Sequence, residues 1–294
     1  MFTAILASLL SQTGLKQVPI QEDVYEIQAD SLGNLYVIDS YFDKRKPFNR
    51  IYVMNAGGTP KEVLKRPYNG IRFLGLEQNN RPIFGERRDK PETKLFRFLP
   101  SSNEEATYFF GKYRAHVDPK TLTISSGNTQ YFKINTPYAF NITGEKSGRF
   151  AFLKLNNTPV ELVIADCATK SLSFIELSGQ NWQKAVSRMP YKQIQFFPKQ
   201  KGQNDRVLLH CTFDAEWIAE QNIPTVGPTP GEFYTAICVA DLKTAEIKPI
   251  IALNRSIGSQ GGDGMNVRNQ SAVIDNKTIA FVWRSKLYTY QLSK

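Results

Sequence analysis

A group of four short segments, each bounded by Gly, Asn, Asp or Pro, recurs along this chain and restricts its fold more than any other feature. The first copy consists of Tyr25–Ala29, Leu35–Ser40, Arg50–Asn55 and Glu62–Leu64. Apolar and polar residues alternate within these segments, which is the period of a half-buried β-strand. Helical periodicity is almost absent and is weakly visible only around Asp214–Gln221. The pattern predicts an all-β chain built from repeated strand pairs.

The copies recur about every 45 residues, the spacing of four-stranded propeller blades. A weaker unit fits between Lys112 and Thr136, so we expect a β-propeller of about six blades. The final unit supplies only three strands, and a strand near Leu15–Ile20 would provide the fourth and close the ring. The remaining predicted strands are Ile71–Glu77, Pro82–Glu86, Lys94–Leu99, Thr107–Phe110, Phe140–Thr143, Arg149–Leu155, Glu161–Asp166, Leu172–Leu177, Gln193–Phe197, Arg206–Phe213, Ala236–Asp241, Ile247–Ile251, Ser271–Ile274, Thr278–Trp283 and Lys286–Leu292.

Residues 27–53 carry the most specific pattern, Ile27 to Asp39 followed by Arg50-Ile-Tyr-Val53. Asp30 favours turn initiation, and Gly33 can adopt the positive φ of a tight hairpin. This stretch resembles a blade of the NHL-repeat, TolB-like and SMP-30-like six-bladed propellers. The resemblance implies the fold, and its members range from hydrolases to pure binding scaffolds, so it does not imply one function.

The first residues, 1–14, resemble the apolar part of a secretory signal, although no Lys or Arg precedes it. A secreted or periplasmic protein is therefore one expectation. The other is a cytoplasmic protein in which these residues are a native N-terminal strand or result from a shifted start codon. The segment is too short to cross a bilayer. Residues 15–294 form a single domain in this interpretation, which we expect to be monomeric. The three cysteines match no disulfide framework or zinc pattern and are expected to be partly buried thiols.

The formal net charge is +10 at pH 7. This charge is compatible with an anionic partner, and equally with a soluble protein that happens to be basic. The longest basic run is the triplet from Lys44 to Lys46, so no basic tail points to nucleic acid. Among anionic polymers a polysaccharide is favoured over nucleic acid, and a protein partner is the other possibility.

If each blade runs from an inner to an outer strand, the loops between second and third strands share one face with the connections between blades. Several basic loops would then form a ligand-facing surface, or merely a solvated rim, and the long segment Asp214–Glu232 would be a lid or a partner contact. Two aromatic residues in these loops could stack on a sugar or base, and a Gly-rich loop could approach a ligand closely or be an ordinary connection. The predicted ligand-binding residues are Lys44, Arg45, Lys46, Arg87, Arg88, Trp182, Tyr191, Asp263 and Asn266.

The inventory of catalytic residues is poor, because the chain has only His116 and His210. A His-rich zinc site is nearly excluded, and no nucleophile elbow, Walker loop or dinucleotide fingerprint is present. The resemblance to SMP-30-like proteins implies calcium in the channel, for which the scattered candidates are Asp39, Glu86, Asn128 and Asp263. The leading hypothesis is thus a non-enzymatic binding propeller without a cofactor, and the alternative is a calcium-dependent hydrolase or lactonase.

Overall fold

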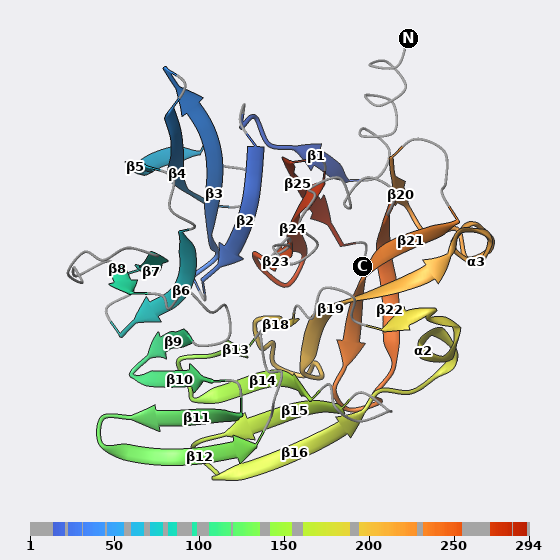
Figure 1. Ribbon diagram of the computed structural model, residues 1–294. Coiled ribbons are helices and arrows are strands. Elements are labelled where there is room, and N and C mark those ends of the chain that lie inside the picture. The colour runs from blue at the N-terminus through green and yellow to red at the C-terminus, as the bar shows by residue number, and fades with distance from the viewer. Residues whose placement is uncertain are drawn as a thin grey trace.

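Twisted, mostly antiparallel sheets arranged around a common axis make up this protein (Figure 1). In the computed structural model the described strands form five sheets, whose innermost strands are β2, β6, β13, β18 and β23. The chain is a β-propeller. The structure describes residues 14–20, 23–30, 32–44, 46–55, 60–67, 71–78, 82–86, 96–98, 106–118, 120–135, 142–154, 161–188, 194–227, 232–254, 271–283 and 285–292.

The first sheet confirms the blade predicted from residues 27–53. Its hairpin between β2 and β3 is held by Asp30, whose Oδ1 accepts hydrogen bonds from the backbone N–H groups of Leu32 (2.8 Å) and Asn34 (2.9 Å). Gly33 takes a φ of 81°, a left-handed conformation that glycine adopts at little cost. The strands are β2 Asp23–Ala29, β3 Asn34–Asp43, β4 Lys46–Asn55 and β5 Lys61–Pro67.

The second sheet corrects the expectation of six blades. It has seven strands in the order β12-β11-β10-β9-β6-β7-β8, so the weak unit and the unit before it are hydrogen-bonded into one sheet. The join is a parallel pairing of β6 with β9 at Gly75, where an added Cβ would lie 1.9 Å from the Phe109 carbonyl oxygen. The strands are β6 Arg72–Glu77, β7 Pro82–Glu86, β8 Phe96–Phe98, β9 Ala106–Gly111, β10 Tyr113–Val117, β11 Thr121–Ser126 and β12 Thr129–Asn135.

The next two sheets follow the predicted strand order, and the fourth has two additional short strands, β17 and β20. The third contains β13 Thr143–Gly144, β14 Arg149–Lys154, β15 Glu161–Asp166 and β16 Ser171–Glu176. The fourth contains β17 Ser187–Arg188, β18 Ile194–Phe196, β19 Arg206–Asp214, β20 Thr225–Val226, β21 Phe233–Asp241 and β22 Ile247–Asn254.

Two short helices accompany the fourth sheet, α2 Gln180–Lys184 and α3 Ala215–Glu220. The segment predicted as a lid contains α3 and β20. Ile218 is fully buried, the ring of Trp217 stacks on Phe213 at 4.5 Å, and β20 pairs with β22. The described part of this segment is therefore packed on its own sheet.

The prediction that an N-terminal strand completes the last sheet is confirmed. β1 Leu15–Gln17 pairs antiparallel with β25 Lys286–Gln291, outside β24 Thr278–Trp283 and β23 Ser271–Val273. The first and last described strands thus share one sheet, which closes the ring of sheets.

The core is divided among the interfaces between neighbouring sheets. Along β3, Leu35 and Val37 belong to the cluster shared with the last sheet, whereas Tyr36 and Ile38 belong to the cluster shared with β6 and β7. Both faces of β3 are therefore buried, whereas apolar–polar alternation indicates a strand that is buried on one face. The three cysteines are free thiols, as predicted, and they are buried more fully than the expected partial burial. Within the described residues no helix is long and apolar enough to cross a membrane.

Candidate ligand-binding site

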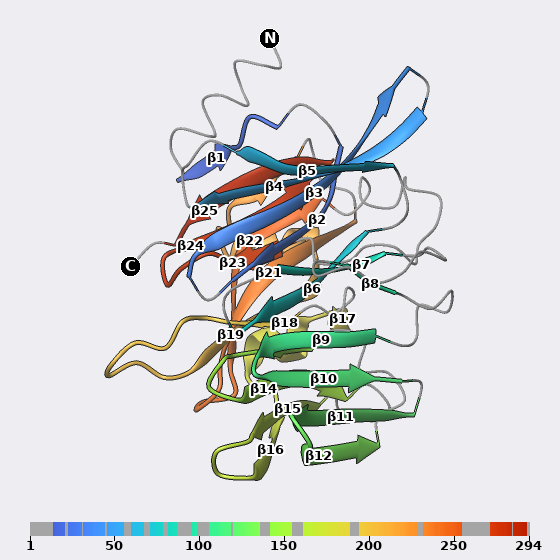
Figure 2. The ribbon, with the colours of Figure 1, turned by 90° about the vertical axis from the view of Figure 1, so that its left-hand side faces the viewer.

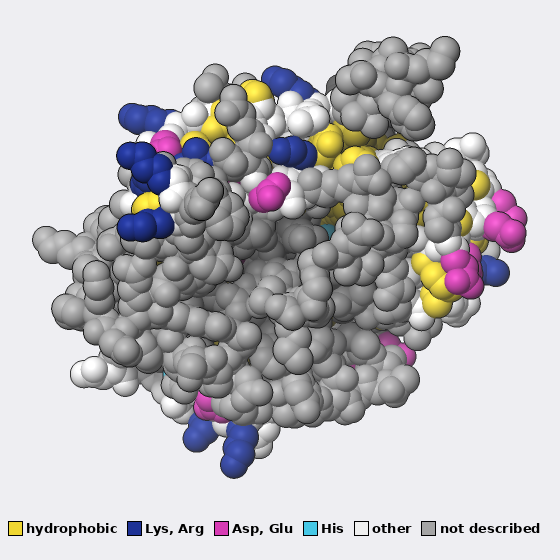
Figure 3. Space-filling model, turned by 45° about the horizontal axis from the view of Figure 1, so that its top comes forward, with side chains coloured by type: hydrophobic (Ala, Val, Ile, Leu, Met, Phe, Trp, Pro, Cys, Tyr) yellow, Lys and Arg dark blue, Asp and Glu magenta, His cyan; other side chains and the backbone are white. Residues whose placement is uncertain are grey.

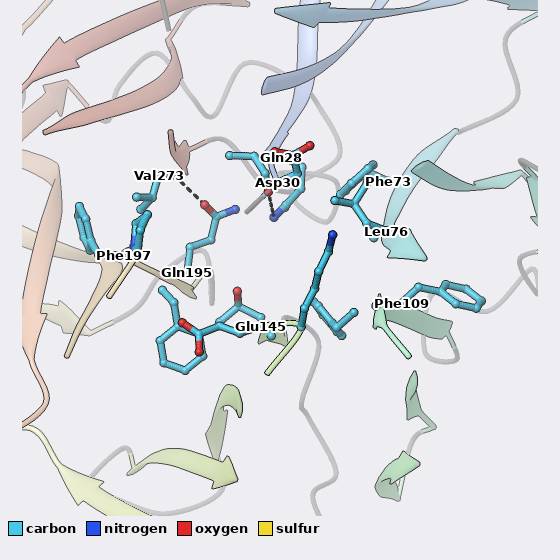
Figure 4. A pocket seen from close by; sticks show the side chains of 18 residues that line it. Gln28, Asp30, Phe73, Leu76, Phe109, Glu145, Gln195, Phe197 and Val273 are labelled. Carbon is cyan, nitrogen blue, oxygen red and sulfur yellow. Dashed lines mark hydrogen bonds between the residues drawn. The ribbon is translucent and has the colours of Figure 1, made fainter. Parts of the chain in front are cut away.

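A pocket of about 130 Å³ lies where the inner strands converge, at their C-terminal ends (Figure 4). Each of the five sheets contributes to its lining. We call it the channel pocket, and its residues are Gln28, Ala29, Asp30, Phe73, Gly75, Leu76, Phe109, Phe110, Gly111, Thr143, Gly144, Glu145, Lys146, Gln195, Phe196, Phe197, Pro198 and Val273.

Hydrogen bonds from one sheet to the next fix the wall of this channel. Gln195 on β18 accepts a hydrogen bond at its Oε1 from the backbone N–H of Val273 on β23, at 2.8 Å. Glu26 on β2 accepts one at its Oε1 from the backbone N–H of Phe73 on β6, at 3.4 Å. Side chains therefore satisfy backbone donors that the inner edge of a sheet would leave open.

Protein donors engage both oxygens of Asp30 in the channel pocket and one oxygen, Oε2, of Glu145. Asp30 accepts two backbone N–H groups at Oδ1, and its Oδ2 accepts from Asn34 Nδ2 at 2.8 Å and from the Tyr36 hydroxyl at 3.3 Å. Burial and the neighbouring Asp30 carboxylate raise the pKa of Tyr36, so this hydroxyl stays a donor at neutral pH. Glu145 accepts from the Ser147 hydroxyl at 3.0 Å and pairs with Arg149 at 3.6 Å.

Two donors in the same pocket are not engaged. The Gln195 side chain is buried, and its Nε2 has no hydrogen-bond partner among the described residues. In Figure 4 this amide points across the pocket toward Gln28 and Asp30. Lys146 follows β13 in a turn, is half-buried, and has no ion-pair partner in the described part of the chain. Its aliphatic stem lies over Gly111, where an added Cβ would come 3.1 Å from Lys146 Cγ.

The described lining of the channel pocket contains no Ser, Cys or His that could form a nucleophile–base pair. His210 lies on β19 and is buried, with its Nε2 2.9 Å from the Ser271 hydroxyl, and burial lowers its pKa to about 4. His116 lies on β10 with its Nδ1 3.0 Å from the Thr107 hydroxyl.

The basic residues predicted on the loop face fall partly within the described chain. Lys44 and Lys46 are exposed at the tip of the hairpin between β3 and β4, and Lys65 is exposed on β5. We call Lys44, Lys46 and Lys65 the basic hairpin. Figure 3 shows Lys and Arg side chains gathered over this part of the surface. Beyond Ser40 the strand β3 no longer pairs with β2, so the hairpin projects from its sheet (Figure 2). The remaining predicted residues, Arg45, Arg87, Arg88, Tyr191, Asp263 and Asn266, lie outside the described residues, as do residues 1–13.

Trp182 was expected to stack on a ligand, and this expectation is wrong. The side chain is 4% exposed and belongs to the core between the third and fourth sheets. The helix α2 that carries it folds back onto β22, because Asn181 Nδ2 donates to the Ile247 carbonyl at 2.8 Å. An indole buried in this way has no face left for a sugar or base.

The residues considered for calcium are dispersed. Asp39 on β3 is fully buried and forms a bidentate pair with Arg50, at 3.2 and 2.8 Å, so its oxygens are not open to a metal. Glu86 ends β7, Asn128 is exposed after β11, and Asp263 is outside the described residues. Within the described chain no group of three His, Cys, Asp or Glu is placed to hold a metal ion.

Sequence reasoning missed the channel pocket itself. Gln195 and Lys146 come from separate sheets, and neither lies in a motif. A usable signal was the position of Gln28, Thr143 and Gln195 near the ends of predicted first strands, because the ends of inner strands meet at the axis of a propeller.

No family model matches this chain, and no curated protein does either. Among solved structures it is similar to one described as YCF48 bound to D1 peptide, with 9% identity and a TM-score of 0.42, covering 96% of each chain. It is also similar to PorZ, described as an essential bacterial surface component of the type-IX secretion system of Porphyromonas gingivalis, with 8% identity and a TM-score of 0.29. That match covers 96% of this chain and 39% of PorZ. Likenesses this distant carry no argument about function.

Proposed function

We propose that this protein is a non-enzymatic binding propeller that holds a small ligand, or the end of a larger one, in the channel pocket. The observation that carries the proposal is the buried Gln195 amide, whose Nε2 lines this pocket without a partner among the described residues. A buried donor left unsatisfied costs about 1–3 kcal/mol, and a bound acceptor would recover that cost. Apolar walls with a few convergent polar groups are typical of ligand sites.

The test is to fill the pocket. Gln28 lines it and is half-buried, so Gln28→Trp places an indole in the cavity without replacing a fully buried side chain. We expect small ligands found by ligand-observed NMR on the wild-type protein to lose binding to Gln28→Trp. The matched control is Gln130→Trp on β12, an exposed position outside the pocket. Ligands that bind Gln28→Trp and Gln130→Trp equally well would disprove the proposal.

A second binding surface is supported by the basic hairpin. Lys44, Lys46 and Lys65 are exposed on neighbouring strands of one sheet. Lys46 begins β4, and Lys65 on β5 pairs with Arg50 of that strand. We propose that this surface contacts an anionic polymer, a polysaccharide before nucleic acid, or an acidic protein. Nothing described favours the calcium-dependent hydrolase, which stays a prediction from the sequence.

Heparin serves as the polyanionic probe for this second surface. Replacing Lys44, Lys46 and Lys65 together by Ala should weaken heparin binding at low salt by about tenfold and reduce its salt dependence, because fewer counterions are released. Replacing Lys133, Lys170 and Lys243 on other parts of the surface removes the same charge and should have a smaller effect. Equal losses in the two triple variants would mean that net charge, and not the hairpin, controls binding.

A further inference from the structure

The balance of donors and acceptors in the channel pocket restricts what it can hold. Both oxygens of Asp30 accept two hydrogen bonds each, and Glu145 is paired with Arg149 and Ser147. Two donors of the lining, Lys146 Nζ and Gln195 Nε2, have no partner within the described chain. A ligand that supplied donors would find both oxygens of Asp30 and the Oε2 of Glu145 already occupied, whereas a ligand that supplied oxygens would satisfy both Lys146 and Gln195.

We propose that the channel pocket binds a carboxylate carried on a small apolar body, with Lys146 and Gln195 as its donors. This inference rests on the proposed function, that the pocket is a binding site. An ammonium donor and an amide donor together match the two oxygens of one carboxylate, and the bond to the ammonium would be charge-assisted. A neutral carbonyl would satisfy one donor and leave the lysine charge without a counterion.

The size of the cavity sets the size of that apolar body. Its volume is about 130 Å³, whereas pockets for drug-sized ligands span roughly 300–1,000 Å³. An apolar cavity of about 150 Å³ is large enough for benzene. The pocket therefore takes a group of about one amino-acid side chain and does not accommodate a nucleotide or an oligosaccharide.

Aromatic and aliphatic side chains form the wall that would receive this group. Phe73 is stacked on Tyr36 with ring centroids 4.9 Å apart and meets Phe84 edge-to-face at 5.8 Å, so its position is set by packing. Phe109, Leu76 and Val273 complete the apolar lining and are buried. A branched aliphatic chain or a single ring gains most from such a wall.

The source of the carboxylate is either a free small acid or the C-terminus of a peptide chain. The two share the chemistry above and differ in whether chain continues beyond the pocket mouth. The free acid is 3-methylbutyrate and the peptide is Ala-Ala-Leu, and the binding of each is compared with that of its own primary amide. The amide keeps the shape and removes the charge, so each pair isolates the carboxylate.

The experiment is an NMR titration of these four probes against wild-type protein, Lys146→Met, Gln195→Glu and the control Lys133→Met. Lys146→Met keeps the stem over Gly111 and removes the charge. Gln195→Glu keeps the acceptor for the Val273 N–H and removes the donor. Lys133 is exposed on β12, away from the pocket. Circular dichroism and thermal unfolding establish that each variant is folded before it is titrated.

We expect at least one acid to bind wild type and Lys133→Met about tenfold more tightly than its amide does. Lys146→Met should remove that preference, and Gln195→Glu should weaken the acid further because it adds a like charge. Tighter binding of Ala-Ala-Leu than of 3-methylbutyrate identifies a chain terminus as the ligand, and the reverse identifies a free acid; both results support a carboxylate site.

Two results would overturn the inference, and they separate its failure from that of the proposed function. Amides that bind as tightly as the acids, with Lys146→Met unchanged, would reject the carboxylate and leave a binding pocket. If small apolar amines, amides and acids all bind wild type and Gln28→Trp to the same extent, the pocket is not a binding site and both proposals fall.

Discussion

The two ends of the channel differ in how tightly they are built. At the pocket end, Gln195 bonds to the Val273 backbone of the next sheet, and Gly75 lets β9 pair closely with the inner strand β6. At the other end β3 and β4 run past their sheet neighbours, and the exposed Lys44 and Lys46 flank the tip of the hairpin. One end has a cavity of set shape and the other a projecting charge, so they suit ligands of different kinds.

The largest expected effect lies at the pocket end. Gly75 has a φ of 120°, and a Cβ there would meet the Phe109 carbonyl oxygen at 1.9 Å. Gly75→Ala should lower the free energy of unfolding by about 4 kcal/mol, from backbone strain together with overpacking. Urea unfolding measures this change.

The matched control is Gly127→Ala. Gly127 has a φ of 57° and no atom within 4 Å of an added Cβ, so this variant carries strain without overpacking. We expect it to cost about 1 kcal/mol. Similar losses in the two variants would show that the contact between β6 and β9 contributes nothing to stability.

Substitutions at Asp39 and Arg50, where β3 and β4 lie within their sheet, should cost more stability than substitutions at the exposed Lys44 and Lys46. Arg50 pairs with the fully buried Asp39, so Arg50→Met leaves a buried carboxylate without its cation and should cost about 3 kcal/mol. The double variant Asp39→Asn with Arg50→Met should lose less in urea unfolding, because no charge is then buried unpaired. A double variant that is less stable than the single one would contradict this account.

Acid should lower the free energy of unfolding through His210, which lies on β19 and contacts Ser271, the first residue of β23. Burial holds its pKa at about 4 in the folded chain, below the ordinary 6.5, so protons bind the unfolded chain preferentially as the pH falls. Stability is lost from about pH 6.5 downward until both forms are protonated below about pH 4, and the loss between pH 7.5 and pH 5 is about 2 kcal/mol.

His210→Gln removes this titration while keeping a polar side chain beside Ser271. Urea unfolding at pH 7.5 and at pH 5 should show a loss about 2 kcal/mol smaller in the variant than in wild type. The contributions of carboxylates to the loss of stability are the same in both proteins and therefore cancel when the two losses are compared. An equal loss in the two proteins would mean that His210 is not protonated on unfolding.

The smallest effect belongs to the hairpin tip. Lys44→Ala and Lys46→Ala remove exposed side chains and should each change the free energy of unfolding by less than about 0.5 kcal/mol. Thermal unfolding at low salt measures it. If either substitution lowered the free energy of unfolding as much as Arg50→Met does, the hairpin tip would be as important for stability as the buried pair of Asp39 and Arg50.

The repeating strand pairs predict a propeller from sequence alone, and the pattern around Asp30 and Gly33 predicts its first hairpin. Alternation also predicts that Leu35 and Tyr36 face different neighbours, because side chains of a strand alternate between its faces. The pairing of β1 with β25 follows from the strand missing in the last unit. These features are local in the chain or follow from counting strands.

Other features depend on atoms that meet only after folding. The blade count changed because Gly75 admits the backbone of β9, and nothing near Gly75 in the sequence marks that contact. Trp182 reads as a loop aromatic, yet burial against β22 and its neighbours decides its role. Lys146 and Gln195 share a pocket only because the inner strands end around one axis. The sequence by itself determined the strands, their alternation and the closure, since these depend on near neighbours; tertiary structure alone decided the site, because its residues are brought together by packing.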